Sequence, residues 1–293
     1  MYSLFKNAYS LNIYREQYGK NIVNMYREQY RPSRLINYDK VMFELKKCSD
    51  ICTNCNFQKL QKLKKTGHME IDGGHLTKNI FYRKIANIDV LIKTIFISKE
   101  DKENYMSKER YNNIIKYTKF FSDKVLNGET QNFLLFYSLK KCPKCFIRED
   151  NKSSCIILYI EKADMNIYEL KIKDKEWVKL IINILEILKY IQSFNIIHGD
   201  FHPGNILIKK IDNINVPIIN DLDKCRTIEK WNLEYSKEDI YKFFDFICKY
   251  NLCQTIFEKT FIEYLDSIKI FIKNYNKDLN IVNEVIYKLE NYF

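Results

Sequence analysis

The residues with the clearest chemical potential lie in one short loop at residues 198–207, which reads His-Gly-Asp-Phe-His-Pro-Gly-Asn-Ile-Leu. Pro203 and Gly204 are turn-forming residues, and a turn there brings Asp200 and Asn205 side by side. A carboxylate can orient a hydroxyl group and accept its proton, and an amide oxygen can bind Mg²⁺. The loop therefore has the groups that phosphoryl transfer needs.

A second acidic stretch follows at residues 217–223, which read Pro-Ile-Ile-Asn-Asp-Leu-Asp. Its carboxylates come at the end of an apolar segment that has the composition of a strand. Mg²⁺ that binds nucleotide phosphates usually takes one or two protein oxygen ligands. Either Asp221 or Asp223 could supply the second of these ligands beside Asn205.

The elements expected to position these residues form a mixed α+β protein, with a strand-rich first part and a helical second part that meet near residue 162. Alternating and continuous apolar runs predict strands, and apolar residues three and four apart predict helices. The expected strands are residues 68–71, 80–85, 90–97, 133–139 and 155–160. The expected helices are residues 101–121, 174–194, 236–250, 255–271 and 280–292.

The first 50 residues are expected to form a helical, tyrosine-rich extension. The pentapeptide Tyr-Arg-Glu-Gln-Tyr occurs twice, beginning at Tyr14 and at Tyr26. Tyrosines four residues apart share one face of a helix. We expect this face to pack against the larger domain, and a partner-binding helix is the alternative.

Lys93 interrupts the apolar strand expected at residues 90–97. A buried ammonium needs a charged partner, unless the side chain faces solvent instead. Glu109, in the following helix, is the expected partner, and Glu103 is the competing one. Gly73 and Gly74 form a turn that could approach a phosphate, although Asp-Gly-Gly is also an ordinary hairpin turn.

Two Cys-x-x-Cys pairs could bind a structural ion. Four thiolates on two such pairs form a tetrahedral zinc site, and the alternative is that the thiols bind no metal. The long separation between the pairs is unusual for zinc. The candidate zinc ligands are Cys52, Cys55, Cys142 and Cys145, with Cys48 and Cys155 as substitutes.

Composition narrows the class of protein. The chain has 293 residues, a net charge of +11 and nine cysteines. Its lysines are spread along the sequence, so the charge does not require a nucleic-acid partner. No apolar run reaches membrane-spanning length, and residues 1–20 lack the apolar core of a secretory signal. We therefore expect a cytoplasmic protein with reduced thiols and no transmembrane segment.

The order of these elements, with the loop at residues 198–207, resembles the protein-kinase-like superfamily from about residue 67 to the C-terminus. The His-Gly-Asp and Pro-Gly-Asn form of the loop is similar to atypical branches, namely aminoglycoside and choline phosphotransferases and the kinase-like proteins of large DNA viruses. The resemblance implies a bilobal fold with a small β-rich N-lobe and a helical C-lobe. The expected domains are residues 1–50 for the helical extension, 51–162 for the N-lobe and 163–293 for the C-lobe.

The resemblance assigns roles to residues at matching positions. Asp200 matches the catalytic aspartate and Asn205 the magnesium-binding asparagine. Asp221 matches the second magnesium ligand, and spacing favours it over Asp223. Lys93 matches the lysine that contacts the nucleotide phosphates.

Further matches concern support of the site and recognition of the nucleotide. Glu109 matches the helix partner of the phosphate-binding lysine, and His198 matches the histidine that braces the loop. The backbone from Glu161 to Ala163 matches the segment that recognises adenine. More loosely, Asp239 resembles the aspartate that anchors the loop from below.

Three features depart from the family pattern. The only glycines near the expected phosphate-binding loop are the pair at residues 73 and 74. His202 replaces the lysine that protein Ser/Thr kinases have two residues after the catalytic aspartate. About a dozen residues separate Asp223 from the next helix, without an Ala-Pro-Glu motif, so no conventional activation loop is expected.

The resemblance implies an ATP- and Mg²⁺-dependent kinase that transfers the γ-phosphate to a hydroxyl, with protein serine or threonine as the first acceptor. A small-molecule alcohol is the alternative acceptor. A catalytically weak pseudokinase that serves as a binding scaffold is the alternative of another class. For a viral protein, the expected location is the host cytoplasm or the virion.

Overall fold

The computed structural model describes residues 33–47, 61–62, 78–97, 105–142, 154–211, 214–249, 259–277 and 281–292. These residues form a mixed α+β protein that divides into two compact units. The first unit comprises Met1–Ser107 and Lys119–Lys162, and the second comprises Lys108–Thr118 and Ala163–Phe293.

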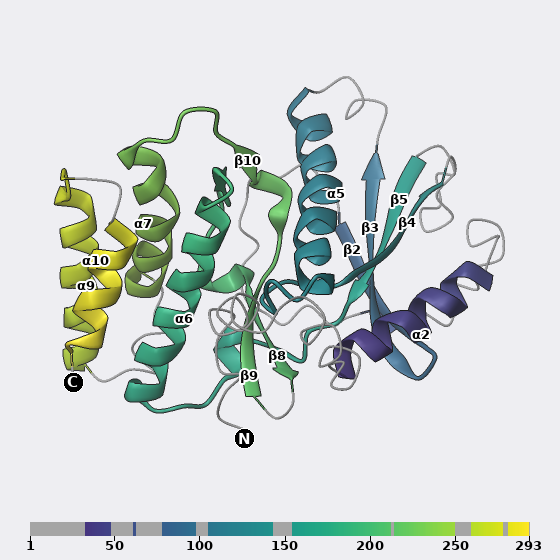
Figure 1. Ribbon diagram of the computed structural model, residues 1–293, viewed down its shortest axis with the longest axis horizontal. Helices are drawn as coiled ribbons and strands as arrows, with labels where there is room; N and C mark the ends of the chain where they lie inside the picture. The colour runs from purple at the N-terminus through teal and green to yellow at the C-terminus, as the bar shows by residue number, and fades with distance from the viewer. Residues whose placement is uncertain are drawn as a thin grey trace, which may run out of the picture. The chain divides into compact units, whose positions relative to one another are not determined.

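The first unit is built on a five-stranded antiparallel sheet with the strand order β1-β2-β3-β5-β4 (Figure 1). Ala86 and Asn87 connect β2 to β3 with positive φ angles of 51° and 63°. Two such residues form a tight turn whose twist matches that of the flanking strands. The strands are β1 (Gln61–Lys62), β2 (Lys78–Ile85), β3 (Ile88–Ile97), β4 (Phe136–Cys142) and β5 (Ser154–Glu161).

Helix α2 (Ser33–Lys47) contacts the sheet of the first unit at β2 and β4. Tyr38 on α2 stacks on Tyr137 of β4, with ring centroids 5.5 Å apart. The part of the expected N-terminal extension that the structure describes is thus integral to the first unit. The two Tyr-Arg-Glu-Gln-Tyr segments lie outside the described residues.

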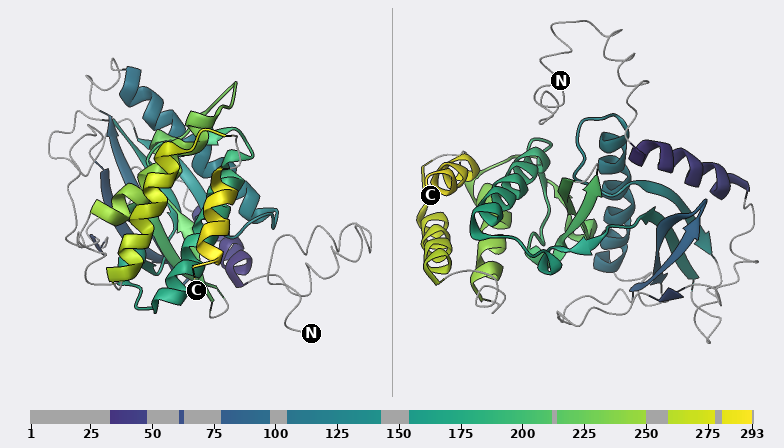
Figure 2. Two further views of the ribbon diagram at one scale, coloured as in Figure 1. Left: turned by 90° about the vertical axis from the view of Figure 1, so that its left-hand side faces the viewer. Right: turned by 90° about the horizontal axis from the view of Figure 1, so that it is seen from below.

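The described residues of the second unit contain four helices besides the shared part of α5, and two small antiparallel sheets. Helix α7 packs against α9, and α10 packs against α6 (Figures 1 and 2). The sheets have the orders β6-β8-β9 and β10-β7. The helices are α6 (Asp174–Gln192), α7 (Leu233–Lys249), α9 (Lys259–Asn274) and α10 (Ile281–Glu290). The strands are β6 (Met165–Asn166), β7 (Ile196–Ile197), β8 (Ile206–Ile211), β9 (Ile214–Ile219) and β10 (Arg226–Thr227), and the short 3-10 turns are η2 (Ile167–Glu169), η3 (Pro203–Asn205) and η4 (Leu222–Lys224).

Helix α6 forms the central support of the second unit. The apolar residues that recur at three and four along it are buried, which confirms the core-facing stripe expected from the sequence. Each such side chain stabilises the fold by about 1.5–3 kcal/mol when it is fully buried. The helix leads through a turn at residues 193–195 into β7 and then into the loop that carries Asp200. The stripe comprises Trp177, Ile181, Ile184, Leu188 and Ile191.

Helix α5 (Tyr105–Leu126) belongs to both units, since its residues 108–118 fall in the second. In the first unit, Phe121 of this helix stacks on Phe133, with ring centroids 4.1 Å apart. The helix confirms the expectation from Tyr105 to Phe121 and extends to Leu126, while residues 101–104 of the expected helix lie outside the described residues. The strand expected at residues 68–71 lies outside the described residues. No described helix is long and apolar enough to cross a membrane.

Candidate active site

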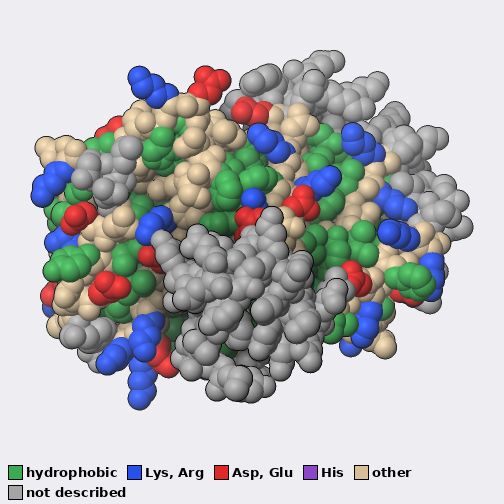
Figure 3. All heavy atoms as spheres, in the orientation of Figure 1, with side chains coloured by type: hydrophobic (Ala, Val, Ile, Leu, Met, Phe, Trp, Pro, Cys, Tyr) green, Lys and Arg blue, Asp and Glu red, His purple; other side chains and the backbone are tan. Residues whose placement is uncertain are grey.

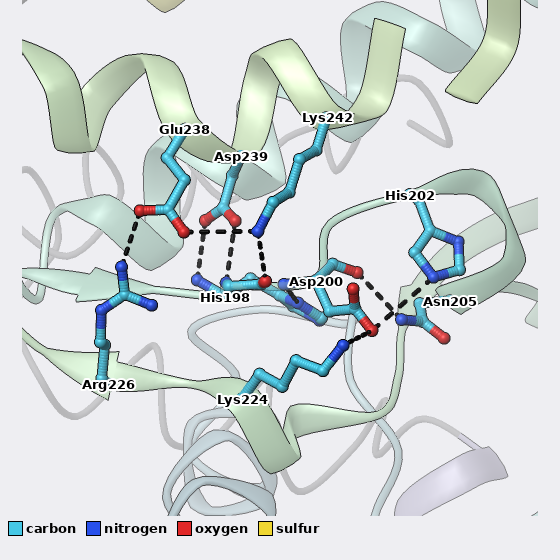
Figure 4. Close-up of polar contacts among 10 residues, drawn as sticks. His198, Asp200, His202, Asn205, Lys224, Arg226, Glu238, Asp239 and Lys242 are labelled. Atoms are coloured by element: carbon cyan, nitrogen blue, oxygen red, sulfur yellow. Dashed lines mark hydrogen bonds and ion pairs between the residues drawn. The ribbon is translucent and has the colours of Figure 1, made fainter. Parts of the chain in front are cut away.

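The loop that carries Asp200 is fixed to helix α7 by a buried carboxylate. Both oxygens of Asp239 accept backbone hydrogen bonds, from the N–H of His198 at 2.7 Å and of Gly199 at 2.8 Å (Figure 4). Burial raises the pKa of Asp239, and the two N–H donors act in the opposite direction. Lys242, one turn further along α7, donates to the carbonyl of Gly199 at 2.6 Å. Asp239 therefore anchors the loop to α7 through two direct hydrogen bonds.

His198 links this loop to the second acidic stretch. Its Nδ1 accepts from the N–H of Asp200 at 3.3 Å, so the proton lies on Nε2, which donates to the carbonyl of Asn220 at 3.0 Å. The N–H of Asn220 in turn donates to the carbonyl of Asn205 at 2.9 Å. The fully buried His198 thus braces the loop against the second acidic stretch.

Asp200 and Asn205 lie together at this loop, as the turn predicted. The Nδ2 of Asn205 donates to the carbonyl of Asp200 at 2.9 Å, which leaves Oδ1 as the atom that can coordinate a cation (Figure 4). His202 caps η3 by accepting from the N–H of Gly204 at 3.1 Å, and Pro203 opens this turn. Asp200 and Asn205 are five residues apart in the sequence, and the turn brings them to the same loop. One offers a carboxylate that can accept a proton, and the other an amide oxygen that can bind a metal ion.

Asp221 has a left-handed backbone conformation, with φ 57° and ψ 63°. Such a conformation is rare for residues other than glycine, asparagine and aspartate, and strained positions concentrate at functional sites. Asp221 is half-buried, whereas Asp223 is 5% exposed. The greater accessibility of Asp221 favours it over Asp223 as a ligand for a bound cation.

Helix α5 supports this acidic stretch within the second unit. Asn113 donates to the carbonyl of Asp223 at 3.5 Å, and the hydroxyl of Tyr117 bonds to the hydroxyl of Thr227 at 2.9 Å. Asn113 and Tyr117 of α5 thus attach this helix to η4 and β10 within the second unit.

Asp200 has a cationic neighbour that the sequence did not indicate. The Nζ of Lys224 lies 2.9 Å from Oδ2 of Asp200, whose side chain is 25% exposed. The Nε2 of His202 lies 3.8 Å from the same oxygen, and the ring stacks on Phe246. Burial lowers the pKa of His202, with Asp200 acting in the opposite direction, so the imidazole is neutral near pH 7. No local pattern signals the pairing of residues 200 and 224.

The residues expected to contact the nucleotide from the first unit are described only in part. Lys93 is 7% exposed on β3, between β2 and β5, so the alternative in which it faces solvent is wrong. Glu109 is half-buried on α5, in the part that belongs to the second unit. Gly73 and Gly74 lie outside the described residues.

Glu161, at the end of β5, has a structural role that the sequence did not suggest. Its carboxylate accepts from Arg34 of α2 at 2.9 Å and from the N–H of Leu135 at 3.1 Å. Its own N–H donates to the carbonyl of Leu135 at 2.8 Å. The Glu161 N–H is therefore engaged within the first unit, and Ala163, two residues on, begins the second unit.

Among the described residues, no group of three or more His, Cys, Asp or Glu side chains could hold a metal ion. The expected magnesium pair, Asn205 and Asp221, consists of one amide and one carboxylate, a donor set that suits a cation held mainly by phosphates. Of the candidate zinc ligands, Cys52, Cys55 and Cys145 lie outside the described residues. Cys142 is buried at the end of β4.

Comparison of the sequence with family models and with curated proteins found no match. The functional assignment therefore depends on the residues and the geometry of the loop itself.

Proposed function

We propose that this chain is an ATP-dependent phosphotransferase that transfers the γ-phosphate to a hydroxyl group, with protein serine or threonine as the first acceptor class. The observation that carries the proposal is the Asp200 loop, which Asp239 anchors and His198 joins to the stretch with Asp221. Two oxygen ligands and an accessible carboxylate held on a rigid backbone are the parts that this reaction requires.

In the proposed reaction, the oxygen of the acceptor hydroxyl bonds to the γ-phosphorus as the bond from this phosphorus to ADP breaks. The hydroxyl proton passes to the carboxylate of Asp200 and then to water, and ADP leaves with the bond electrons. Asn205 and Asp221 would hold Mg²⁺, which supplies charge neutralisation for the phosphates. Lys93 is the first-unit residue proposed to contact the phosphates.

The decisive experiment is transfer from γ-labelled ATP with Mg²⁺ to the protein itself, to serine- and threonine-containing proteins and to small alcohols. We expect Asp200→Asn to lower the transfer rate roughly 10²- to 10⁴-fold, because it removes the proton acceptor. The matched control is Asp266→Asn on α9, where the side chain is 48% exposed and pairs with Lys269. Excess EDTA should abolish transfer by the wild-type protein.

Two results would overturn the proposal. One is wild-type protein that neither labels any of these acceptors nor hydrolyses ATP. The other is an Asp200→Asn variant that is as active as the Asp266→Asn control. Phosphorylation of alcohols alone would retain the reaction and reassign the acceptor to small molecules.

A further inference from the structure

The inference concerns Lys224, and it rests on the function proposed above. Lys224 is the last residue of η4, and its side chain is 36% exposed. Its Nζ donates to Oδ2 of Asp200 at 2.9 Å (Figure 4). Among the described residues, the other ion-pair partner within 4.0 Å of this carboxylate is the imidazole of His202, at 3.8 Å, which carries a charge only when it is protonated. Lys224 is therefore the full positive charge at the proposed proton acceptor.

The fold holds the backbone of Lys224 close to the Asp200 loop. Gly199 has φ +77°, and a Cβ atom built there would lie 2.5 Å from the carbonyl oxygen of Lys224. On either side of Lys224 along the chain, Leu222 is 6% exposed and Cys225 is fully buried. The close approach and the buried neighbours fix the backbone from which the Lys224 side chain extends to Asp200.

A cation is needed at this place when the phosphoryl group arrives. The negative oxygens of the γ-phosphate must approach the carboxylate of Asp200, and the two repel each other. A lysine is a compact positive charge on a flexible stem, so it can contact the carboxylate and a phosphoryl oxygen together. A positive charge held where negative charge gathers during transfer stabilises the transition state electrostatically.

We infer that Lys224 is a further catalytic residue, whose ammonium bridges Asp200 and an oxygen of the phosphoryl group during transfer. The residue neither gives nor takes a proton in the reaction. Its contribution is the placement of a positive charge between two negative groups.

The experiment compares Lys224→Met with Lys224→Arg and with the exposed control Lys230→Met, six residues further along the chain. For Lys224→Met we expect kcat to fall roughly 10²- to 10³-fold, since one electrostatic contact to the transition state is lost. The KM for ATP should stay within about threefold, because ground-state binding is retained. Lys224→Arg should recover part of kcat, and Lys230→Met should match the wild type. Melting temperatures check that the variants fold, and Lys224→Gln replaces the Met variant if that one does not.

The outcomes separate this inference from the proposed function. An inactive wild-type protein overturns the proposed function and the inference together. An active wild type with Lys224→Met and Lys224→Gln at wild-type kcat overturns the inference alone. A rise in KM for ATP at unchanged kcat also overturns it, because Lys224 would then act only in binding. Equal loss in the Arg and Met variants contradicts a role for the charge.

Discussion

At the scale of the residue, the loop that carries Asp200 depends on glycines at which the surrounding atoms leave little room for a Cβ atom. Gly199 has a left-handed φ of +77°, and the loop passes so close to the carbonyl of Lys224 that a Cβ atom would lie 2.5 Å from it. Gly204 is also crowded, but there the nearest atom is Cε1 of the His202 ring, at 2.8 Å. The His202 ring can give way only by weakening its bond to the Gly204 N–H and its stacking on Phe246, whereas the backbone of η4 cannot move without disturbing its buried neighbours.

We therefore predict that Gly199→Ala destabilises the protein by about 2 kcal/mol or more, through left-handed strain and overpacking. Gly204→Ala serves as the matched control. It should lower the free energy of unfolding by less than Gly199→Ala does, since the close neighbour of Gly204 is a side chain. Urea unfolding of both variants measures the difference. Equal stability of the two variants would contradict a rigid contact between Gly199 and Lys224.

At the scale of the element, two helices are each attached to a neighbouring segment by one buried charged residue. Asp239 connects α7 to the loop that carries Asp200, and Arg34 connects α2 to β5. The Arg34 side chain is 3% exposed in its pair with Glu161 and also donates to the carbonyls of Gln131 and Phe133. Because so many of its donors are used, α2 is held in one register on the sheet.

Loss of the ion pair between Arg34 and Glu161 should lower the stability of the first unit. We predict that Arg34→Met lowers the free energy of unfolding by about 3–5 kcal/mol, because it leaves the Glu161 carboxylate buried without its cation. On the same helix, Lys47→Met removes an exposed pair with Glu44 and should change stability by less than about 1 kcal/mol. Thermal or urea unfolding compares the two.

The double variant Arg34→Met with Glu161→Leu tests the cause of the loss. Removal of both charges should recover part of the stability lost in Arg34→Met, since no buried charge is then left alone. Strict additivity of the two substitutions would count against the ion pair as the reason for the loss.

At the scale of the whole molecule, the distribution of charge and the effect of ligand binding on stability bear on the possible partners. On the face shown in Figure 3, Lys and Arg side chains of the described residues are scattered, with Asp and Glu among them. This distribution agrees with the view that the net charge of +11 does not by itself require a nucleic-acid partner.

If the chain binds ATP with Mg²⁺, the ligand must stabilise the folded protein. At a concentration of about 100 times Kd, the gain is about 2.7 kcal/mol, which should raise the melting temperature by roughly 5 °C or more. Mg²⁺ alone and ATP with EDTA are the controls, and Asp221→Asn should reduce the shift. Absence of any shift at millimolar MgATP would argue against nucleotide binding, whatever the transfer assays give.

The sequence by itself determined the local features of this protein. The apolar stripe of α6 and the strands around Lys93 depend on periodicity within one element, and Asp200 and Asn205 meet because five residues and a turn separate them. Such features are local, so they can be recognised without knowledge of the rest of the chain.

The tertiary structure alone decided which distant groups meet. Asp200 pairs with Lys224 across 24 residues, and Arg34 reaches Glu161 across 127. No periodicity encodes these contacts, because they arise when separately formed elements bury their apolar faces together and their polar groups must then find partners. The loop could be recognised as a candidate site from its residues. The cation beside its carboxylate, and the two N–H bonds to Asp239 that hold it in place, emerged only once the chain was folded.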